Sequence, residues 1–186
     1  MTARPARIVL LNGIGSVGKS SIAKALQRIA ADRFLHVEMD AFLQMLPEDS
    51  FGQPDGLTFE TMQRDGEPVV LIRSGPTIAR AMRGMRYAVA AMAAQGNNLI
   101  VDEVLLGGEF AEYAALLSGF ELFTVGVFAP LDVLEARERQ RGDRLIGLAR
   151  GQYGRVHLGM AYDLEIDTSA ATPLECAERI KRKFAL

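Results

Sequence analysis

A glycine-rich stretch near the N-terminus has the residue types and the spacing of a phosphate-binding loop. It fits the pattern GxxxxGK[ST] at every fixed position, between an apolar run and a helix-period segment. Glycines allow backbone N–H groups to turn inward toward phosphate oxygens, and the N-terminus of the following helix adds positive potential. The stretch therefore predicts a nucleoside triphosphate site formed by Gly13, Ile14, Gly15, Ser16, Val17, Gly18, Lys19, Ser20 and Ser21.

Two side chains of this loop have specific chemistry to perform. Lys19 supplies a mobile positive charge for the outer phosphates. Ser20 follows it directly, and its hydroxyl is placed to bind the magnesium ion that bridges the same phosphate oxygens.

Carboxylates follow two of the apolar runs that we expect to be strands. Asp40 comes after the run 34–39, and Asp102 and Glu103 come after the run 99–101. Ligands of an open parallel sheet bind beyond the carboxyl ends of its strands, so these side chains should face the crevice of the phosphate loop. We expect Asp102 to hold magnesium together with Ser20; the alternative is that it caps a turn or helix. Glu103 either shares the metal or is solvated.

Asp40 is a candidate general base. Transfer of a phosphoryl group to an alcohol needs a group that orients the acceptor hydroxyl and takes its proton. The alternative is an N-cap for a short helix over 41–46, a position that favours aspartate, and spacing alone does not separate the two.

Three arginines, Arg137, Arg141 and Arg144, step by four and three along one predicted helix face. They could neutralise charge on a transferring phosphoryl group, and Gly142 with Asp143 would give a lid over about 137–150 its hinge. The alternative is a solvated helix with supporting ion pairs, such as one between residues 135 and 139.

Short apolar runs alternate with helix-period segments along the chain, which is typical of strand–helix units and a mainly parallel sheet. We expect strands at 8–11, 34–39, 99–101, 122–128 and 164–168, and helices at 19–30, 41–46, 76–96, 110–117, 131–140 and 173–184. Two short runs over 57–72 flank Asp65 and Gly66, a pair that favours a hairpin turn outside the main sheet.

The composition is that of one soluble globular domain. The chain has 186 residues, is 49% hydrophobic, and has a net charge of −2. This charge argues against nucleic-acid or anionic-membrane partners, and no run approaches the length of a membrane span. A single cysteine, Cys176, excludes an internal disulfide and favours the cytoplasm. The two histidines, His36 and His157, are too far apart for a histidine-pair motif, and we expect each to be packed or at the surface.

Taken together, these residues resemble the chloramphenicol phosphotransferase family. The resemblance rests on the phosphate loop, on VEMD at 37–40, which ends at Asp40, and on VDEVLLGG at 101–108. It rests also on Arg137 with RGDR at 141–144, and on YDLEIDT at 162–168. The matching segments keep their order and cover nearly the whole chain.

The resemblance implies an α/β three-layer P-loop NTPase fold with a five-stranded parallel sheet, of the nucleoside monophosphate kinase type. It also implies a kinase that uses ATP and Mg²⁺ to phosphorylate a hydroxyl of a small molecule. In the family's founding activity that hydroxyl belongs to chloramphenicol. A role in antibiotic resistance and a role in metabolism would use the same chemistry, so the sequence leaves both open. When the family's functional residues are mapped onto this sequence, the resemblance implies that Asp40 is the catalytic base. It implies that Lys19 and Ser20 are the phosphate and magnesium ligands, and that the arginines of the lid are Arg137, Arg141 and Arg144.

The segment 48–77 has no correspondence in the chloramphenicol enzyme, so we expect it to line the acceptor site and leave the acceptor open. One alternative is a metabolic kinase of the same fold that acts on a nucleotide, a sugar acid or another metabolite. Another is a nucleotide-dependent switch without acceptor chemistry.

Overall fold

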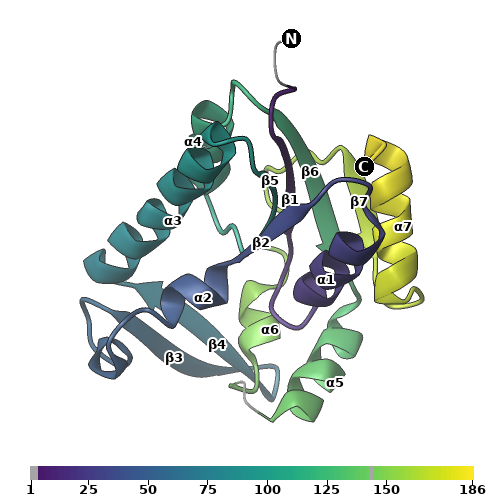
Figure 1. Ribbon diagram of the computed structural model, residues 1–186. Coiled ribbons are helices and arrows are strands. Elements are labelled where there is room, and N and C mark those ends of the chain that lie inside the picture. The colour runs from purple at the N-terminus through teal and green to yellow at the C-terminus, as the bar shows by residue number, and fades with distance from the viewer. Residues whose placement is uncertain (1–3, 143–144) are drawn as a thin grey trace.

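The computed structural model describes residues 4–142 and 145–186, and its centre is a five-stranded parallel sheet in the order β2-β5-β1-β6-β7 (Figure 1). The predicted five-stranded parallel sheet is confirmed. Its strands are β1 (Arg7–Asn12), β2 (Phe34–Glu38), β5 (Asn98–Glu103), β6 (Glu121–Phe128) and β7 (Leu164–Asp167).

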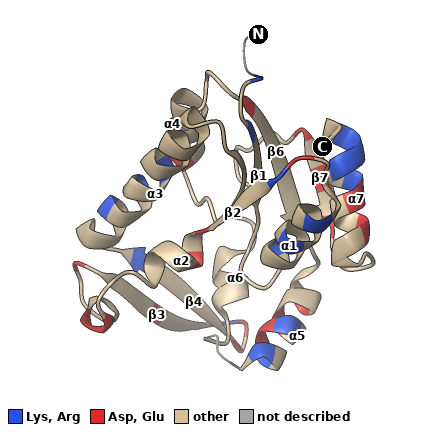
Figure 2. Cartoon of the chain, in the orientation of Figure 1, with Lys and Arg blue, Asp and Glu red and all other residues tan. Residues whose placement is uncertain are grey.

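Helices cover both faces of this sheet, which gives three layers (Figure 1). One face packs against α1 (Lys19–Ile29) and α7 (Pro173–Phe184), and the other packs against α3 (Pro76–Ala94) and α4 (Glu109–Leu116). Strand side chains alternate between the two layers, so each central strand is apolar on both faces. Figure 2 accordingly shows β1 and β6 with charged residues at their N-terminal ends and none along their centres.

A two-stranded antiparallel hairpin lies outside the main sheet, at the bottom of Figure 1. It consists of β3 (Leu57–Arg64) and β4 (Glu67–Ser74), and its tight turn places Asp65 and Gly66 at positive φ. Helix α6 (Leu148–Gln152) packs against β4, and α5 (Leu131–Arg141) packs against α6. The hairpin and these helices surround the carboxyl ends of β1 and β5.

The local structure departs from the sequence expectations in two places. The short helix α2 spans Met39–Leu43 and its N-cap is Glu38, so the expected helix over 41–46 was displaced. Helix α6 was not expected, because five residues are too few to show a helical period. A short 3-10 turn, Glu48–Ser50, joins α2 to the hairpin.

None of the helices in the described part of the chain is long and apolar enough to cross a lipid bilayer.

The hairpin and α6 pack backbone to backbone through two glycines. The Val70 N–H donates to the Gly147 carbonyl oxygen at 2.9 Å. A methyl group on Gly151 would overlap the Val70 carbonyl, and one on Gly147 would overlap Pro68. The absence of side chains at these two positions is what lets α6 lie against β4.

This packing predicts that Gly151→Ala lowers the free energy of unfolding by about 1–3 kcal/mol, because the added methyl group forces α6 away from β4. Urea unfolding followed by circular dichroism measures the effect. The matched control is Gly84→Ala on α3, where an added methyl group meets no atom within 4 Å. Equal stabilities for the two variants would contradict the close contact.

Candidate active site

The loop that joins β1 to α1 has the geometry of a phosphate cradle. Gly18 is the N-cap of α1 with φ at 101°, and Ser16 also lies at positive φ, at 64°. A side chain on Gly13 would overlap the Val127 carbonyl of β6, so the loop can start only with glycine. No side chain in the described structure caps α1, and no acidic residue lies in its first turn, so the helix presents its N–H groups to the loop.

Lys19, Ser20 and Asp102 meet at the centre of the site. The Ser20 hydroxyl donates to an Asp102 carboxylate oxygen at 2.6 Å, and the Lys19 ammonium lies 3.5 Å from the other oxygen. Lys19 also donates to the carbonyl oxygens of Gly13 and Ile14. Burial raises the pKa of Asp102, but the Lys19 charge and the groups around the carboxylate outweigh it and hold that pKa below its usual range. Asp102 is therefore a carboxylate at neutral pH.

Asp40 and the phosphate loop line the same cavity, which has a volume of about 1360 Å³. Asp40 lies in the first turn of α2 and is not the N-cap residue, so the capping alternative is wrong. The cavity also has an apolar wall, formed by Leu43, Phe51, Leu57, Phe59 and Ile72.

The expected lid arginines come from α5. Arg137 and Arg141 lie one turn apart and both line the cavity, whereas Arg144 falls outside the described residues. Arg137 donates to the Thr168 hydroxyl at 2.9 Å and to its carbonyl oxygen at 2.7 Å. The same hydroxyl donates to the Val17 carbonyl of the phosphate loop, so Arg137 is fixed beside that loop.

Two glutamates of α5 join it to α6. Glu138 is buried and accepts from the N–H groups of Gly147 and Ala149, which caps the start of α6. Glu135 pairs with Arg150 at 2.6 Å, so it makes a contact between the two helices in place of the pair with Arg139 that the solvated-helix alternative offered. These contacts join helices α5 and α6 to each other.

Glu103 lies on the opposite face of the sheet from Asp102, because neighbouring residues of a strand alternate. It is buried and accepts a hydrogen bond from the Tyr113 hydroxyl of α4 at 2.8 Å. Burial raises its pKa to about 6. The two roles considered for Glu103, a share in the metal and solvation, are both wrong.

Two residues of the site were missed in the sequence. Asn12 is fully buried, and its side chain joins the ends of β1 and β5 by accepting from the Leu105 N–H. Gln152 comes from α6, and its side-chain oxygen accepts from the Gly15 N–H of the phosphate loop at 3.0 Å. Gln152 is 137 positions from Gly15, and no local pattern signals such a contact.

His157 is packed beside the same end of β1. Its ring stacks on Phe128 with centroids 3.9 Å apart, and its Nδ1 atom lies 2.8 Å from the Tyr162 hydroxyl. Burial and the Lys19 charge lower the pKa of His157, so it is neutral at pH 7. Asn12 donates to the Tyr162 hydroxyl, so this aromatic cluster supports the start of the phosphate loop.

The fold is that of P-loop kinases. A structure of the Mycobacterium tuberculosis APS kinase in complex with AMPPNP and APS is similar with a TM-score of 0.68 and 17% identity, covering 99% of this chain and 100% of that one. The Deinococcus radiodurans tunicamycin resistance protein is similar with a TM-score of 0.63 and 20% identity, covering 97% and 96%. A Sinorhizobium meliloti gluconokinase is similar with a TM-score of 0.59 and 16% identity, covering 98% and 94%.

The chain belongs to the chloramphenicol phosphotransferase-like family, whose model matches residues 6–185. It is 30% identical over 184 residues to a protein found in two strains of Mycobacterium tuberculosis and named "Putative O-phosphotransferase". The alignment covers 96% of this chain and 82% of the relative. The predicted family and the predicted class of enzyme, a kinase that transfers phosphate to a hydroxyl, are confirmed.

The raised pKa of Glu103 makes stability depend on pH in a predictable direction. The folded protein holds the Glu103 proton more tightly than the unfolded chain, so this group's contribution to stability is largest below pH 4.5 and falls as pH rises to about 6. Glu103→Gln removes this part of the pH dependence. The unfolding free energy of the variant minus that of the parent protein should rise by about 2 kcal/mol as the pH is raised from about 4 to 7.

Urea unfolding at several pH values tests this prediction, and Glu112→Gln is the contrasting control. Hydrogen bonding to Arg86 lowers the pKa of Glu112, so its stabilising contribution is lost as pH falls. The stability difference of that variant should change with pH in the opposite sense. A pH-independent difference for Glu103→Gln would contradict the raised pKa.

Proposed function

We propose that this protein uses Mg²⁺ and ATP to transfer the γ-phosphoryl group to a hydroxyl of a small molecule. Chloramphenicol-like compounds are the first acceptors to test. One observation carries the proposal. A single cavity joins the phosphate loop and Asp102 to Asp40 and to an apolar wall made by the hairpin. A nucleotide and a hydroxylated acceptor therefore have room to meet beside a carboxylate.

At the nucleotide end, the backbone N–H groups of the phosphate loop bind the phosphates and Lys19 contacts the outer ones. Mg²⁺ fits the residues present, because Ser20 and Asp102 offer oxygen atoms, the ligands that magnesium prefers, 2.6 Å apart. When bound, Mg²⁺ neutralises charge on the phosphate oxygens. The depressed pKa of Asp102 keeps this ligand ionised without the metal.

At the acceptor end, Asp40 orients the hydroxyl and takes its proton as the oxygen attacks the γ-phosphorus. A bond forms between the acceptor oxygen and phosphorus, the bond from phosphorus to the β,γ-bridging oxygen breaks, and ADP leaves. Arg137 and Arg141, with Arg144 beyond the described residues, neutralise the transferring group. The contacts of Arg137 with Thr168 hold it in place for this role.

The apolar wall narrows the class of acceptor. Five apolar side chains, from α2, the 3-10 connection and the hairpin, line the same cavity as the phosphate loop. An acceptor with an apolar body and one reactive hydroxyl buries that body against them, whereas a sugar acid gains nothing from the contact. This favours a chloramphenicol-like acceptor over the polar metabolite that a metabolic kinase of the same fold would use. The family description and the name of the tunicamycin resistance protein are consistent with this preference.

The proposal is tested by magnesium-dependent release of ADP from ATP, with chloramphenicol and with a panel of other hydroxylated compounds. Stimulation by chloramphenicol supports both the reaction and the acceptor class. Stimulation by polar metabolites alone would overturn the acceptor class and retain the reaction. ATP binding without stimulation by any compound would favour a nucleotide-dependent switch.

Asp40→Asn should lower kcat roughly 100- to 10,000-fold, because the amide can hold a hydroxyl but cannot take its proton. The Kd for ATP should stay within about threefold of the parent value, since the base does not bind phosphate. Steady-state kinetics measures kcat, and calorimetry measures the Kd for ATP. Asp49→Asn, at a nearby exposed carboxylate, is the control. Full activity in Asp40→Asn would show that another group is the base.

Phe59→Ala should raise the KM for an apolar acceptor at least about tenfold and leave the KM for ATP unchanged, because buried aromatic area is lost at the acceptor end only. Met62→Ala is a matched control. Both residues belong to β3 and are 40% exposed, but only Phe59 lines the cavity. An equal change in acceptor KM for both variants would contradict the apolar acceptor site.

A further inference from the structure

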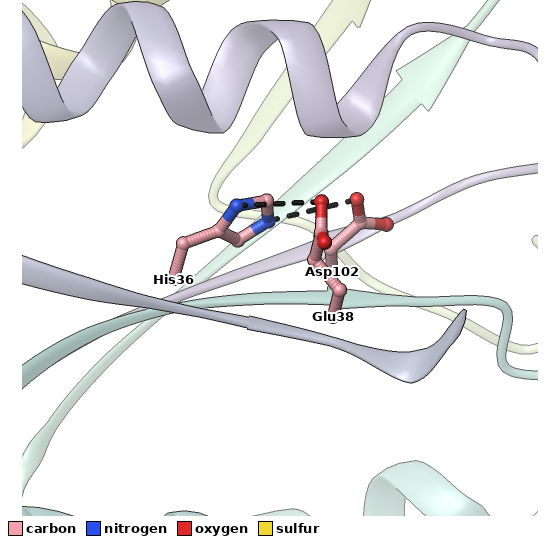
Figure 3. A group of neighbouring side chains, drawn as sticks. All are labelled: His36, Glu38 and Asp102. Atoms are coloured by element: carbon pink, nitrogen blue, oxygen red, sulfur yellow. Dashed lines mark ion pairs between the residues drawn. The ribbon is translucent and has the colours of Figure 1, made fainter. Parts of the chain in front are cut away.

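We propose that His36, Glu38 and Asp102 form a binding site for a divalent transition-metal ion such as Zn²⁺, beside the phosphate loop (Figure 3). This proposal does not depend on the proposed function, because it requires only these side chains and no nucleotide or acceptor.

Strand pairing brings the three side chains to one face of the sheet. His36 and Glu38 are two residues apart on β2, so they point the same way. β2 pairs with β5 in parallel, and this register aligns Glu38 with Asp102. Asp102 points toward Ser20 of α1, so the site lies between the sheet and that helix. The placement follows from the fold and does not rely on a flexible loop.

The distances suit a metal site that closes by small side-chain rotations. His36 Nε2 lies 3.7 Å from an Asp102 carboxylate oxygen, and His36 Nδ1 lies 3.5 Å from Glu38 Oε1. One ligand atom from each residue can be chosen so that all lie within 4.8 Å of one another. Ligands of a tetrahedral metal lie about 3–3.5 Å apart, and rotation of the carboxylates covers the difference.

The burial of His36 is the second observation that points to a ligand. Its side chain is 9% exposed, and its Nε2 atom is buried without a hydrogen-bond partner among the described residues. A buried nitrogen without a partner costs free energy, and so do two carboxylates held close together. Of these two carboxylates, the described structure pairs Lys19 with Asp102 and not with Glu38, so the negative charge of Glu38 is left for another cation. A divalent ion at this point removes both costs.

The donor set selects the metal. One imidazole nitrogen and two carboxylates suit Zn²⁺ or Mn²⁺, whereas Mg²⁺ takes oxygen ligands. On the other side of Asp102, the Ser20 hydroxyl that donates to this carboxylate adds a second oxygen ligand, and Mg²⁺ fits there. Asp102 is therefore shared between a nitrogen-containing site toward β2 and an oxygen site toward the phosphate loop.

The test uses the full, metal-stripped chain without nucleotide. Zn²⁺ is titrated by calorimetry and Co²⁺ by visible absorption, whose intensity reports tetrahedral coordination by the protein. We expect one equivalent of each metal to bind, and Mg²⁺ at the same concentration not to compete. His36→Asn and Glu38→Gln should each weaken Zn²⁺ binding at least about tenfold. The pair of variants keeps the test informative if one of them fails to fold.

Two controls separate this site from incidental metal binding. His157→Asn removes the other histidine of the chain, and Cys176→Ser removes its only thiol. Both variants should keep the parent affinity for Zn²⁺. The proposal is overturned if the parent protein binds no Zn²⁺, if Mg²⁺ competes equally, or if binding survives in His36→Asn and Glu38→Gln but is lost in a control.

Discussion

The parallel pairing of β1 with β5 is the constraint on which the site depends. This register sets Leu11 beside Asp102, one residue before each strand ends, so Asp102 lies where the chain leaves β1 for the phosphate loop. The buried contacts of Asp102 with Lys19 and Ser20 are possible only in that alignment. Asn12 secures it by joining the two strand ends through its fully buried side chain. A shift of one residue would turn Asp102 toward α3 and α4.

The second half of the site is assembled from parts that are distant in the sequence. The hairpin provides an apolar wall, α5 provides arginines, and α6 connects the two. Gly147 and Gly151 let α6 lie against β4, and Glu138 caps α6 from α5. Gln152 then reaches the phosphate loop. The contacts of α6 therefore connect the helix that carries the arginines both to the hairpin and to the phosphate loop.

The sequence predicted the parts of the site that short patterns determine. The phosphate loop, the parallel sheet and the position of Asp102 follow from glycine spacing, apolar runs and strand ends. The opposite orientation of Glu103 could also have been predicted, because adjacent strand residues alternate. The contacts of Gln152 and Thr168 with the loop could not, since they join segments more than a hundred positions apart. The capping alternative for Asp40 failed because α2 starts at Met39, a boundary that propensity does not fix.

The proposed metal site and the proposed transfer of phosphate to a hydroxyl share Asp102, but only the transfer changes an acceptor covalently. The most direct test is mass spectrometry of candidate acceptors incubated with the protein, Mg²⁺ and ATP whose γ-phosphate carries oxygen-18 in its non-bridging positions. Direct transfer of the γ-phosphoryl group predicts an acceptor that gains a phosphoryl group with all of the labelled oxygens. The acceptor keeps its own oxygen in the ester bond. Label found only in inorganic phosphate, with every acceptor unchanged, would contradict it.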